Sequence, residues 1–586
     1  MSARRPLVYN AFDAEARTRS HNPFTHDSDP AWWRNTFRIA VIILLLALLG
    51  LCIASVVGIF KTDGQESLPC EVIYTDYLVV GAGSAGIVAA KVLSDEGLKT
   101  LLMDGGTNDP DDDHLSTPHE NAELVHAFTN LYLWGLGHAL EMPGHDGGHG
   151  FRYPIVASRK TGGGSRVNGM QYVRGVNATY EEIEALMGGD ASWGPSAWLE
   201  AYKWLEHMLD DTVITNTDVH GYEGATQVRL GATNVATATA FVNAANSAFG
   251  GTDCPIVADH NDPDTPVGAS VYWQLSQTED KLRASTSQAY LDPILDCQRE
   301  GGCENPRVVL KTTAHHVIWD GTRAVGVEAS RNGRPLRVMA AKAVILSMGV
   351  QSPLMLQRSG VGPADLLAEV NVPLKYANPN VGTHVRNHPL LILTATGTVN
   401  ATFDDEEGLY TGAVFKRDDS LTSTTRALEL LGIASPGAFT IVGLLLNATS
   451  EGNWTIVNSD PLTMPRVWHN YFSDQADVDT GVALVHDVLD IFDEMGLTPL
   501  DTFADDDEIE DYVRDKYQQS YHWISGARMG ASVEAGGVVD TNCAVFGVEN
   551  LYVVDNSIMP VQATGNTDAP ARALGKMCAD KIIAQL

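Results

Sequence analysis

Blocks of apolar and small residues alternate between Thr75 and Gly106 and predict a strand, a turn, a helix and a second strand. An apolar strand over Tyr77 to Val80 leads into the turn GAGSAG, and a helix follows from about Ala85 to Leu93. The second apolar strand ends at Asp104. This order of elements predicts a parallel βαβ unit that binds a dinucleotide.

The three glycines of this turn have separate roles in such a unit. Gly81 allows the tight turn, Gly83 lets the backbone approach a pyrophosphate, and Gly86 lets the helix pack near the strand. The positive end of the helix dipole points at the phosphates, and Asp104 can accept hydrogen bonds from ribose hydroxyls. The motif alone does not separate FAD from NAD, so other segments must decide.

A second apolar strand followed by an acid occurs near the C-terminus. Leu551 to Val554 predicts a buried parallel strand with Asp555 at its carboxyl end, and a final helix is predicted from about Ala569 to Ile583, just after Asn566. Ligands of open α/β sheets bind at the carboxyl ends of the strands. The end of the chain is therefore expected to return to the nucleotide-binding domain.

A long uncharged run from Ile39 to Phe60 predicts a transmembrane helix. Arginines precede it, and Asp63 and Glu66 follow it, so the positive-inside bias places residues 1–38 in the cytosol as a tail. The sequence thus predicts a single-pass membrane protein, anchored in the membrane through residues 39–60, with a linker at 61–73. Its catalytic part is expected to be lumenal or extracellular.

Size and charge exclude some classes of protein. A chain of 586 residues that is 44% hydrophobic can bury a large core. Its formal net charge of −34 repels nucleic acid, so no nucleic-acid partner is expected. Acidic runs such as 504–511 are typical of solvated loops, and no metal site is predicted. Cys297 and Cys303 flank a Gly-Gly turn and are predicted to pair.

Several motifs follow one another in a characteristic order. SRKTGGGSRVNGMQYVRG begins at Ser158 and SMGVQSPLMLQRSGVG at Ser347; then come VGTHVRNHP from Val381, YHWISGARMG from Tyr521 and VVDNSIMPVQATGNTDAP from Val553. Together they make residues 74–586 resemble the glucose-methanol-choline oxidoreductase family of FAD enzymes, because motif order across a domain is more restrictive than any single turn.

The resemblance implies an α/β fold with two domains. One is a doubly wound, Rossmann-like FAD-binding domain built from discontinuous segments, expected at residues 74–185, 220–365 and 512–586. The other is a substrate domain with an antiparallel sheet, expected at residues 186–219 and 366–511.

The resemblance also implies a catalytic pair, His522 and Asn566. In the family, an alcohol is oxidised when a base takes its hydroxyl proton while the carbon-bound hydrogen passes to the flavin as hydride. His522 suits the proton step because the unperturbed histidine pKa of about 6.5 lies near working pH, and Asn566 offers an amide to hold the oxygen. This pair resembles the His/Asn subgroup that includes choline-oxidising enzymes. His388 also matches a family motif and is expected to be structural.

Contacts with FAD are expected from the glycine turn, the loop after Ser158 and the C-terminal motif. The expected residues are Gly81, Gly83, Ser84, Ala85, Gly86, Asp104, Gly162, Gly163, Ser165, Asn168, Gly169, Asp555, Asn566 and Thr567. Asp104 stands where most family members have Glu. Val167 stands where some have a histidine bonded to the flavin, so FAD is expected to bind non-covalently.

The expected function is FAD-dependent oxidation of a small-molecule alcohol to an aldehyde or ketone, with an electron acceptor that the sequence does not identify. Two alternatives stay open at this point. The same fold can run a non-oxidative flavin reaction, as a lyase or photodecarboxylase, or the chain can be a degenerate, membrane-tethered binding scaffold. Intact His522, Asn566 and Asp555 favour the enzyme.

Overall fold

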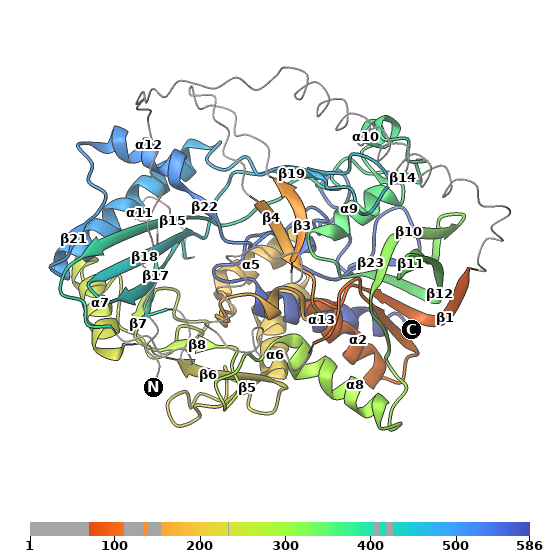
Figure 1. Ribbon diagram of the computed structural model, residues 1–586, viewed down its shortest axis with the longest axis horizontal. Coiled ribbons are helices and arrows are strands. Elements are labelled where there is room, and N and C mark those ends of the chain that lie inside the picture. The colour runs from red at the N-terminus through yellow and green to blue at the C-terminus, as the bar shows by residue number, and fades with distance from the viewer. Residues whose placement is uncertain (1–69, 110–132, 139–153, 232–233, 402–409, 418–425) are drawn as a thin grey trace, which may run out of the picture. The chain divides into compact units, whose positions relative to one another are not determined.

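The computed structural model describes residues 70–109, 133–138, 154–231, 234–401, 410–417 and 426–586. Its first sheet has seven strands in the order β10-β11-β12-β1-β2-β9, with β23 beside β12 (Figure 1). These strands are β1 (Glu71–Val80), β2 (Thr100–Met103), β9 (Arg307–Val309), β10 (Thr312–Asp320), β11 (Arg323–Arg331), β12 (Arg334–Leu346) and β23 (Leu551–Val553).

The core of this sheet is parallel, and its strands end in register. Val80 at the end of β1 pairs with Met103 of β2 and with Leu346 of β12, and Leu346 pairs in turn with Val553 of β23. The residues that follow these strands therefore meet at one edge of the sheet. The predicted βαβ unit and the predicted return of the C-terminus to it are both confirmed.

Helices pack beside this sheet and beside the second sheet described below (Figure 1). α2 (Ser84–Asp95) packs closely on α13 (Asp568–Ile583), because a Cβ on Gly575 would lie only 2.4 Å from the carbonyl oxygen of Ala85. The other helices are α5 (Asn177–Leu186), α6 (Pro195–Leu205), α7 (Val235–Ala248), α8 (Asp292–Arg299), α9 (Gln351–Arg358), α10 (Ala364–Glu369), α11 (Gln475–Glu494) and α12 (Asp506–Lys516).

A second seven-stranded sheet is antiparallel, in the order β21-β15-β18-β17-β16-β7, with β22 beside β15. In Figure 1 it lies at the left, next to α7, α11 and α12. Its strands are β7 (Gly268–Ser270), β15 (Pro389–Thr396), β16 (Ala413–Lys416), β17 (Leu428–Ser435), β18 (Ala438–Leu445), β21 (Thr498–Pro499) and β22 (Gln518–Gln519).

The remaining strands of the described residues form four small sheets. Their strands are β3 (Leu133–His138), β4 (Pro154–Ser158), β5 (Glu206–Met208), β6 (Thr226–Gly231), β8 (Trp273–Leu275), β13 (Val361–Gly362), β14 (Tyr376–Ala377), β19 (Asn453–Thr455) and β20 (Arg466–Trp468). Two disulfides also occur. Cys297 pairs with Cys303, which confirms the prediction, and Cys543 pairs with Cys578 of α13.

The predicted membrane anchor needs correction. No helix in the described ranges combines the length and the apolar character needed to cross a bilayer. The longest one, α11, carries acids along its length, including Asp479, Asp487 and Asp490, and charged side chains are costly in hydrocarbon. The span predicted at 39–60 lies outside the described residues. The transmembrane helix and the single-pass topology derived from it are therefore not retained.

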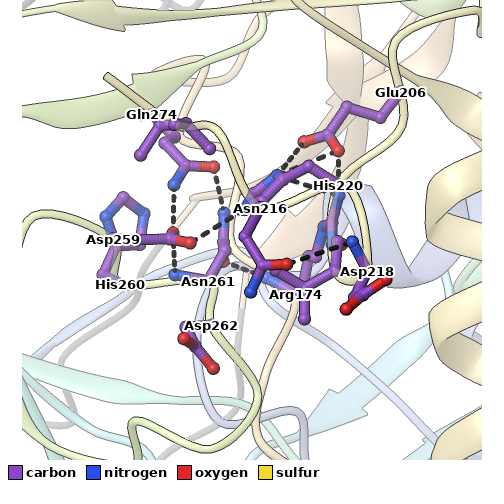
Figure 2. A network of polar contacts seen from close by, with 12 residues as sticks. Arg174, Glu206, Asn216, Asp218, His220, Asp259, His260, Asn261, Asp262 and Gln274 are labelled. Carbon is purple, nitrogen blue, oxygen red and sulfur yellow. Dashed lines mark hydrogen bonds and ion pairs between the residues drawn. The ribbon is translucent and has the colours of Figure 1, made fainter. Parts of the chain in front are cut away.

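A buried ionic network holds the end of the loop that begins at Ser158 (Figure 2). The His220 ring lies between two carboxylates: Nδ1 is 3.1 Å from Oε2 of Glu206, and Nε2 is 2.8 Å from Oδ2 of Asp259. Arg174, the last residue before Gly175, donates to Glu206. Burial alone would lower the pKa of His220, but the hydrogen bonds to Asp259 and Glu206 raise it above the ordinary value.

Two amides extend this network to the backbone. Asn261 Nδ2 donates to Gln274 Oε1 at 2.7 Å, and Gln274 Nε2 donates to Asp259 Oδ1 at 2.6 Å. Asn261 Oδ1 also accepts a hydrogen bond from the backbone N–H of Arg174 at 2.8 Å. Because every link is buried or half-buried, the network fixes the path of the chain at Arg174.

We predict that His220→Ala destabilises the fold by about 3–5 kcal/mol near pH 6, because it removes the cationic partner of Asp259 and leaves the buried Glu206 with Arg174 alone. Since the pKa of His220 is raised in the folded state, its contribution is fully present below the unfolded value of about 6.5 and is lost as pH rises through the folded value. Guanidinium unfolding at pH 6 and pH 9 measures the free energy of unfolding of the variant and of the wild type. The difference in free energy of unfolding between the two proteins should be smaller at pH 9 than at pH 6. An equal difference at both pH values would contradict the ionic role of His220. His316→Ala, at a half-exposed histidine, is the control.

Candidate active site

The turn after β1 is built from backbone contacts that side chains would block. Gly81 has φ of 108°, and a Cβ there would lie 2.3 Å from the carbonyl oxygen of Ser347, at the end of β12. A Cβ on Gly86 would lie 2.0 Å from the carbonyl oxygen of Gly81. α2 then begins at Ser84, and its N-cap, Gly83, makes no side-chain capping bond. The first backbone N–H groups of α2 are thus available to an anion.

Asp104 lies directly beside this turn. Its Oδ2 accepts a hydrogen bond from the backbone N–H of Ala82 at 2.8 Å, and its Oδ1 accepts one from Gly106 at 2.6 Å. Burial raises the pKa of Asp104, although both backbone hydrogen bonds act against the rise. The partly buried carboxyl thus holds the glycine turn in place, and its remaining lone pairs can accept from a ribose hydroxyl.

The loop that begins at Ser158 packs against the glycine turn. It contains the 3₁₀ turn η1 (Gly163–Arg166), and a Cβ on Gly163 would lie 2.9 Å from the Cα of Gly83. Ser165 Oγ donates to the carbonyl of Gly162 at 2.6 Å and accepts from the backbone N–H of Thr286 at 3.0 Å. The two glycine-rich segments predicted to hold one cofactor are therefore in contact.

Ser84 and Ala85 connect the same turn to the C-terminal helix. Ser84 Oγ donates to Oδ1 of Asp568 at 2.6 Å, at the start of α13. The carbonyl of Ala85 touches Gly575 of α13, as described above. Thr567 is the N-cap of α13, and its carbonyl accepts from Asn556 Nδ2 at 3.0 Å. These contacts bring the start of α13 to the glycine turn after β1.

Asn168 and Gly169 lie farther along the loop, beside a buried arginine. Asn168 Oδ1 accepts from Arg283 Nη1 at 2.7 Å, and the same Nη1 donates to the carbonyl of Ser165 at 3.0 Å. Gly169 lies against the Gln171 side chain, where a Cβ would approach Oε1 to 2.7 Å. Arg283 was not predicted from the sequence. Its only signal in the sequence was its place two residues before the segment STSQAYLDP, which begins at Ser285 and is a further short match to the family.

Asp555 follows β23, as predicted, and both of its oxygens have protein partners. Oδ2 accepts from the backbone N–H of Gly349 at 2.9 Å and from Ser352 Oγ at 2.6 Å, and Oδ1 accepts from the N–H of Ser557 at 2.8 Å. Burial raises the pKa of this carboxyl. Asp555 thus ties the C-terminal strand to the start of α9.

His522 and Asn566 lie together, although 44 residues separate them in the sequence. Asn566 Nδ2 is 3.3 Å from His522 Nε2. The other amide atom, Asn566 Oδ1, is buried and has no hydrogen-bond partner in the described part of the chain. An alcohol oxygen placed here would meet a ring nitrogen and an amide group at once.

His388 contacts the other side of the His522 ring. The two Nδ1 atoms are 3.0 Å apart, so one ring donates and the other accepts. Burial lowers the pKa of His522 to about 4. Burial, followed by the nearby His522, lowers the pKa of His388 well below its ordinary value. Both rings are therefore neutral at pH 7, and His522 can accept a proton.

Asn387 holds this pair of rings through their backbone. Its Oδ1 accepts from the N–H of His522 at 2.7 Å, from the N–H of His388 at 3.0 Å and from Ser520 Oγ at 2.9 Å. Its Nδ2 donates to the hydroxyl of Tyr471 at 2.6 Å. The sequence analysis missed Asn387, although it precedes His388 in the RNHP motif.

These residues fit FAD. The glycine turn provides a narrow backbone cradle and helix N–H groups for a pyrophosphate, and Asp104 lies where a ribose would be bound. The loop around Gly163 touches that cradle, and the unpartnered Oδ1 of Asn566 marks a polar site that still needs a ligand.

Comparison with known proteins agrees with this geometry. Family models described as GMC oxidoreductase match residues 75–390 and 448–575. Human mitochondrial choline dehydrogenase is 29% identical over 556 residues, covering 87% of this chain and 90% of that protein.

Solved structures share the fold. The crystal structure of pyridoxine 4-oxidase, attributed to Mesorbium loti, has a TM-score of 0.76 at 22% identity and covers 86% of this chain and 98% of that one. A point mutant of Aspergillus oryzae RIB40 formate oxidase, studied for its FAD modification, has a TM-score of 0.77 at 19% identity, covering 88% of this chain and 99% of that one. The chain belongs to the GMC oxidoreductase family and is an enzyme that uses FAD to oxidise an alcohol.

Proposed function

We propose that this enzyme oxidises a small-molecule alcohol with His522 as the general base and Asn566 as the group that holds the substrate oxygen. The proposal is carried by one observation. His522 Nε2 lies 3.3 Å from the Asn566 amide, whose Oδ1 is buried and lacks a partner among the described residues. When bound, FAD supplies the acceptor for the hydrogen that leaves the carbinol carbon.

The protein's part in the reaction is to orient the alcohol and to move one proton. Neutral His522 takes the hydroxyl proton at Nε2, while its contact with Nδ1 of His388 keeps the ring from turning. Asn387 fixes the backbone under both histidines. The Asn566 amide is uncharged: its Oδ1 can accept a hydrogen bond from the hydroxyl, and its Nδ2 can donate one to the oxygen once the proton has left. In this account His388 positions the base, which goes beyond the structural role expected for it.

For the cofactor we propose non-covalent FAD. Its pyrophosphate is assigned to the turn from Gly81 to Gly86 and its ribose to Asp104. The flavin is assigned to the segment of Gly162, Gly163, Ser165, Asn168 and Gly169. Support comes from the contact of this segment with the glycine turn and from Val167, whose side chain has no nucleophile to bond the flavin. Asp555 and Thr567 are assigned indirect roles, because their hydrogen bonds go to protein groups.

We also propose that the first sheet marks the FAD-binding domain and the second sheet the substrate domain. Two strands of the second sheet, β7 and β22, come from the segments 220–365 and 512–586 that were predicted for the FAD-binding domain. Neither alternative function is favoured by a specific feature of the site. A degenerate scaffold would have no need for the paired histidine and asparagine.

Gly83→Ala should weaken FAD binding at least tenfold, which corresponds to about 1.4 kcal/mol. The protein itself has room for the methyl group, since the nearest atom to a Cβ there is the carbonyl oxygen of Ser347 at 3.9 Å. A bound pyrophosphate would occupy that room. Titration of the apoenzyme with FAD, followed by flavin fluorescence, measures the dissociation constant. Ser94→Ala, at the other end of α2, is the control, and unchanged affinity in Gly83→Ala would contradict the assigned position.

His522→Ala should lower kcat/KM for the best alcohol by about 10²- to 10⁴-fold, the usual contribution of a general base. The variant should keep its FAD, so the flavin spectrum must match wild type. Steady-state oxidation of an alcohol panel provides the measurement. His486→Ala, at an exposed histidine paired with Asp506, should leave the rate unchanged. A variant with full flavin content and wild-type kcat/KM would rule out His522 as the base.

The pH profile of kcat/KM should keep its plateau well below neutrality. Burial depresses the pKa of His522 to about 4, so the base stays neutral until the pH falls close to that value. The acidic limb should therefore have its midpoint near pH 4 and not at the ordinary histidine value of about 6.5. An acidic limb centred at about 6.5 or above would show that the base is a solvated histidine or another group.

A further inference from the structure

Arg528 is a partly buried cation without a hydrogen-bond acceptor. It lies in the segment YHWISGARMG, shortly after His522. Its guanidinium makes no hydrogen bond or ion pair within the described residues. Burial, followed by the charge of Arg386, lowers the pKa of Arg528. Each N–H donor that leaves water without finding an acceptor costs stability, so this guanidinium calls for an explanation.

Glu451 is the acid that acts most strongly on Arg528, but other groups already engage both of its oxygens. Its Oε2 is 2.6 Å from Nδ1 of His384, and its Oε1 accepts from Nη2 of Arg386 at 2.6 Å and from Nε at 3.0 Å. The hydrogen bond with His384 is the largest cause that holds the pKa of Glu451 down, at about 2. Glu182 of α5 is exposed and acts less strongly on Arg528. Since Arg386 balances the charge of Glu451, the charge of Arg528 is left over.

The segment with His384 and Arg386 is fixed by two strand bridges. Val385 pairs with Gly452, and its N–H donates to the Gly452 carbonyl at 3.0 Å. Arg386 pairs with Ile524, whose N–H donates to the Arg386 carbonyl at 3.0 Å. The backbone therefore sets the positions of both side chains before any ligand binds.

Gly536 leaves an open space between Arg528 and His384. A Cβ on Gly536 would lie 3.8 Å from Nη1 of Arg528 and 3.9 Å from Nε2 of His384, and it would meet no closer atom. Nε2 of His384 makes no hydrogen bond in the part of the chain that the structure describes. Gly536 has φ of 84°, which side chains rarely adopt, so glycine keeps this space free. Two nitrogen atoms from distant segments thus face one point.

The turn that carries Gly536 is held by backbone hydrogen bonds. The N–H of Gly536 donates to the carbonyl of Val533 at 3.0 Å, and the N–H of Gly537 donates to that of Ser532 at 2.9 Å. Asn380 Nδ2 donates to the same Val533 carbonyl at 2.7 Å. The space beside Gly536 is therefore part of the fold.

The distances in this space suit a phosphate-type oxyanion. A cationic donor nitrogen lies about 2.7–2.9 Å from an anion oxygen, which places it about 4 Å from the central phosphorus. A guanidinium offers a fork of donors that matches two oxygens of such an anion. A protonated His384 donates through both ring nitrogens, to Glu451 on one side and to the anion on the other.

We propose that Arg528, His384 and Arg386 form a binding site for a phosphate-type dianion. Arg528 supplies the donor fork, and His384 donates through Nε2. Arg386 adds its charge and its Nη1, which makes no hydrogen bond among the described residues. The ligand is inorganic phosphate or the phosphoryl group of a small molecule, because both present the same oxygens. This inference does not depend on the proposed reaction, since none of the proposed reacting groups belongs to the site.

The site is connected to the candidate active site through the backbone. Arg386 precedes Asn387, which accepts hydrogen bonds from the N–H groups of His388 and His522. Across the bridge, Ile524 lies between His522 and Arg528 in the sequence. An anion that contacts Arg386 and Arg528 at once would therefore join the two segments that carry the histidines. Its binding should raise the Tm of the enzyme.

The first test is calorimetric titration of the full-length, FAD-loaded chain with inorganic phosphate, at an ionic strength held constant with sodium chloride. Bound FAD occupies the glycine turn, so phosphate does not bind there. Wild type should show saturable binding, and Arg528→Gln should weaken it by about tenfold or more, because a charge-assisted hydrogen bond is lost. Arg323→Gln, at an exposed arginine paired with Asp320, is the control and should bind like wild type. No saturable binding to wild type, or equal binding to Arg528→Gln, overturns the proposal.

The second test measures Tm in phosphate and in chloride of equal ionic strength. Phosphate stabilises many proteins through exclusion from their surface, so the readout is the difference in Tm shift between wild type and variant. The shift should be larger in wild type than in Arg528→Gln. Arg528→Lys keeps the charge but loses the fork, so its shift should lie between the two. Equal shifts in all three proteins contradict the site.

Two comparisons complete the design. Glycerol phosphate is titrated beside inorganic phosphate: tighter binding of glycerol phosphate identifies a phosphorylated small molecule as the ligand, tighter binding of phosphate identifies the free ion, and failure of both overturns the proposal. The Tm of Arg528→Gln in chloride alone is the other comparison. If it falls well below that of wild type while phosphate does not bind wild type, Arg528 serves an internal acid and the anion site is wrong.

Discussion

The contact between the turn after β1 and the end of β12 is the constraint on which the site depends. Gly81 and Ser347 meet backbone to backbone, so close that no Cβ fits. Because β1, β2, β12 and β23 end in register, this contact also places Asp104 and Asp555 at the same edge of the sheet. The loop with Gly163 then packs on Gly83, and α13 packs on Ala85. The glycine turn proposed to bind the pyrophosphate and the start of α13 are thus fixed by one set of close approaches.

Polar anchors also hold the residues of the candidate active site. Asp555 saturates its oxygens on Gly349, Ser352 and Ser557, and Asn387 holds the backbone of both His388 and His522. Asn566 Oδ1, by contrast, is buried and has no hydrogen-bond partner among the described residues. A buried polar atom without a partner calls for an explanation. We therefore interpret Asn566 Oδ1 as a group that contacts the substrate in the reaction we propose.

Sequence reasoning worked best where the signal was local or the motif order was specific. The βαβ unit, the acids after its strands, the return of the C-terminus, the Cys297–Cys303 pair and the family all followed from short patterns. Contacts between distant segments could not be predicted from such patterns. The RNHP motif gave no reason to place His388 against His522, since that contact depends on the pairing of β15 with β22. The membrane span was inferred from hydropathy alone, and the described fold does not support it.

The most direct test of the account is the absorbance of the FAD-loaded, full-length enzyme in the visible flavin band, followed anaerobically after mixing with ordinary alcohols and with the same alcohols deuterated at the carbinol carbon. The account predicts that a substrate bleaches the flavin in a single turnover, that one aldehyde or ketone forms per flavin, and that deuterium slows the bleaching. A yellow protein that no alcohol bleaches, or bleaching that deuterium does not change and that yields no carbonyl product, would contradict it.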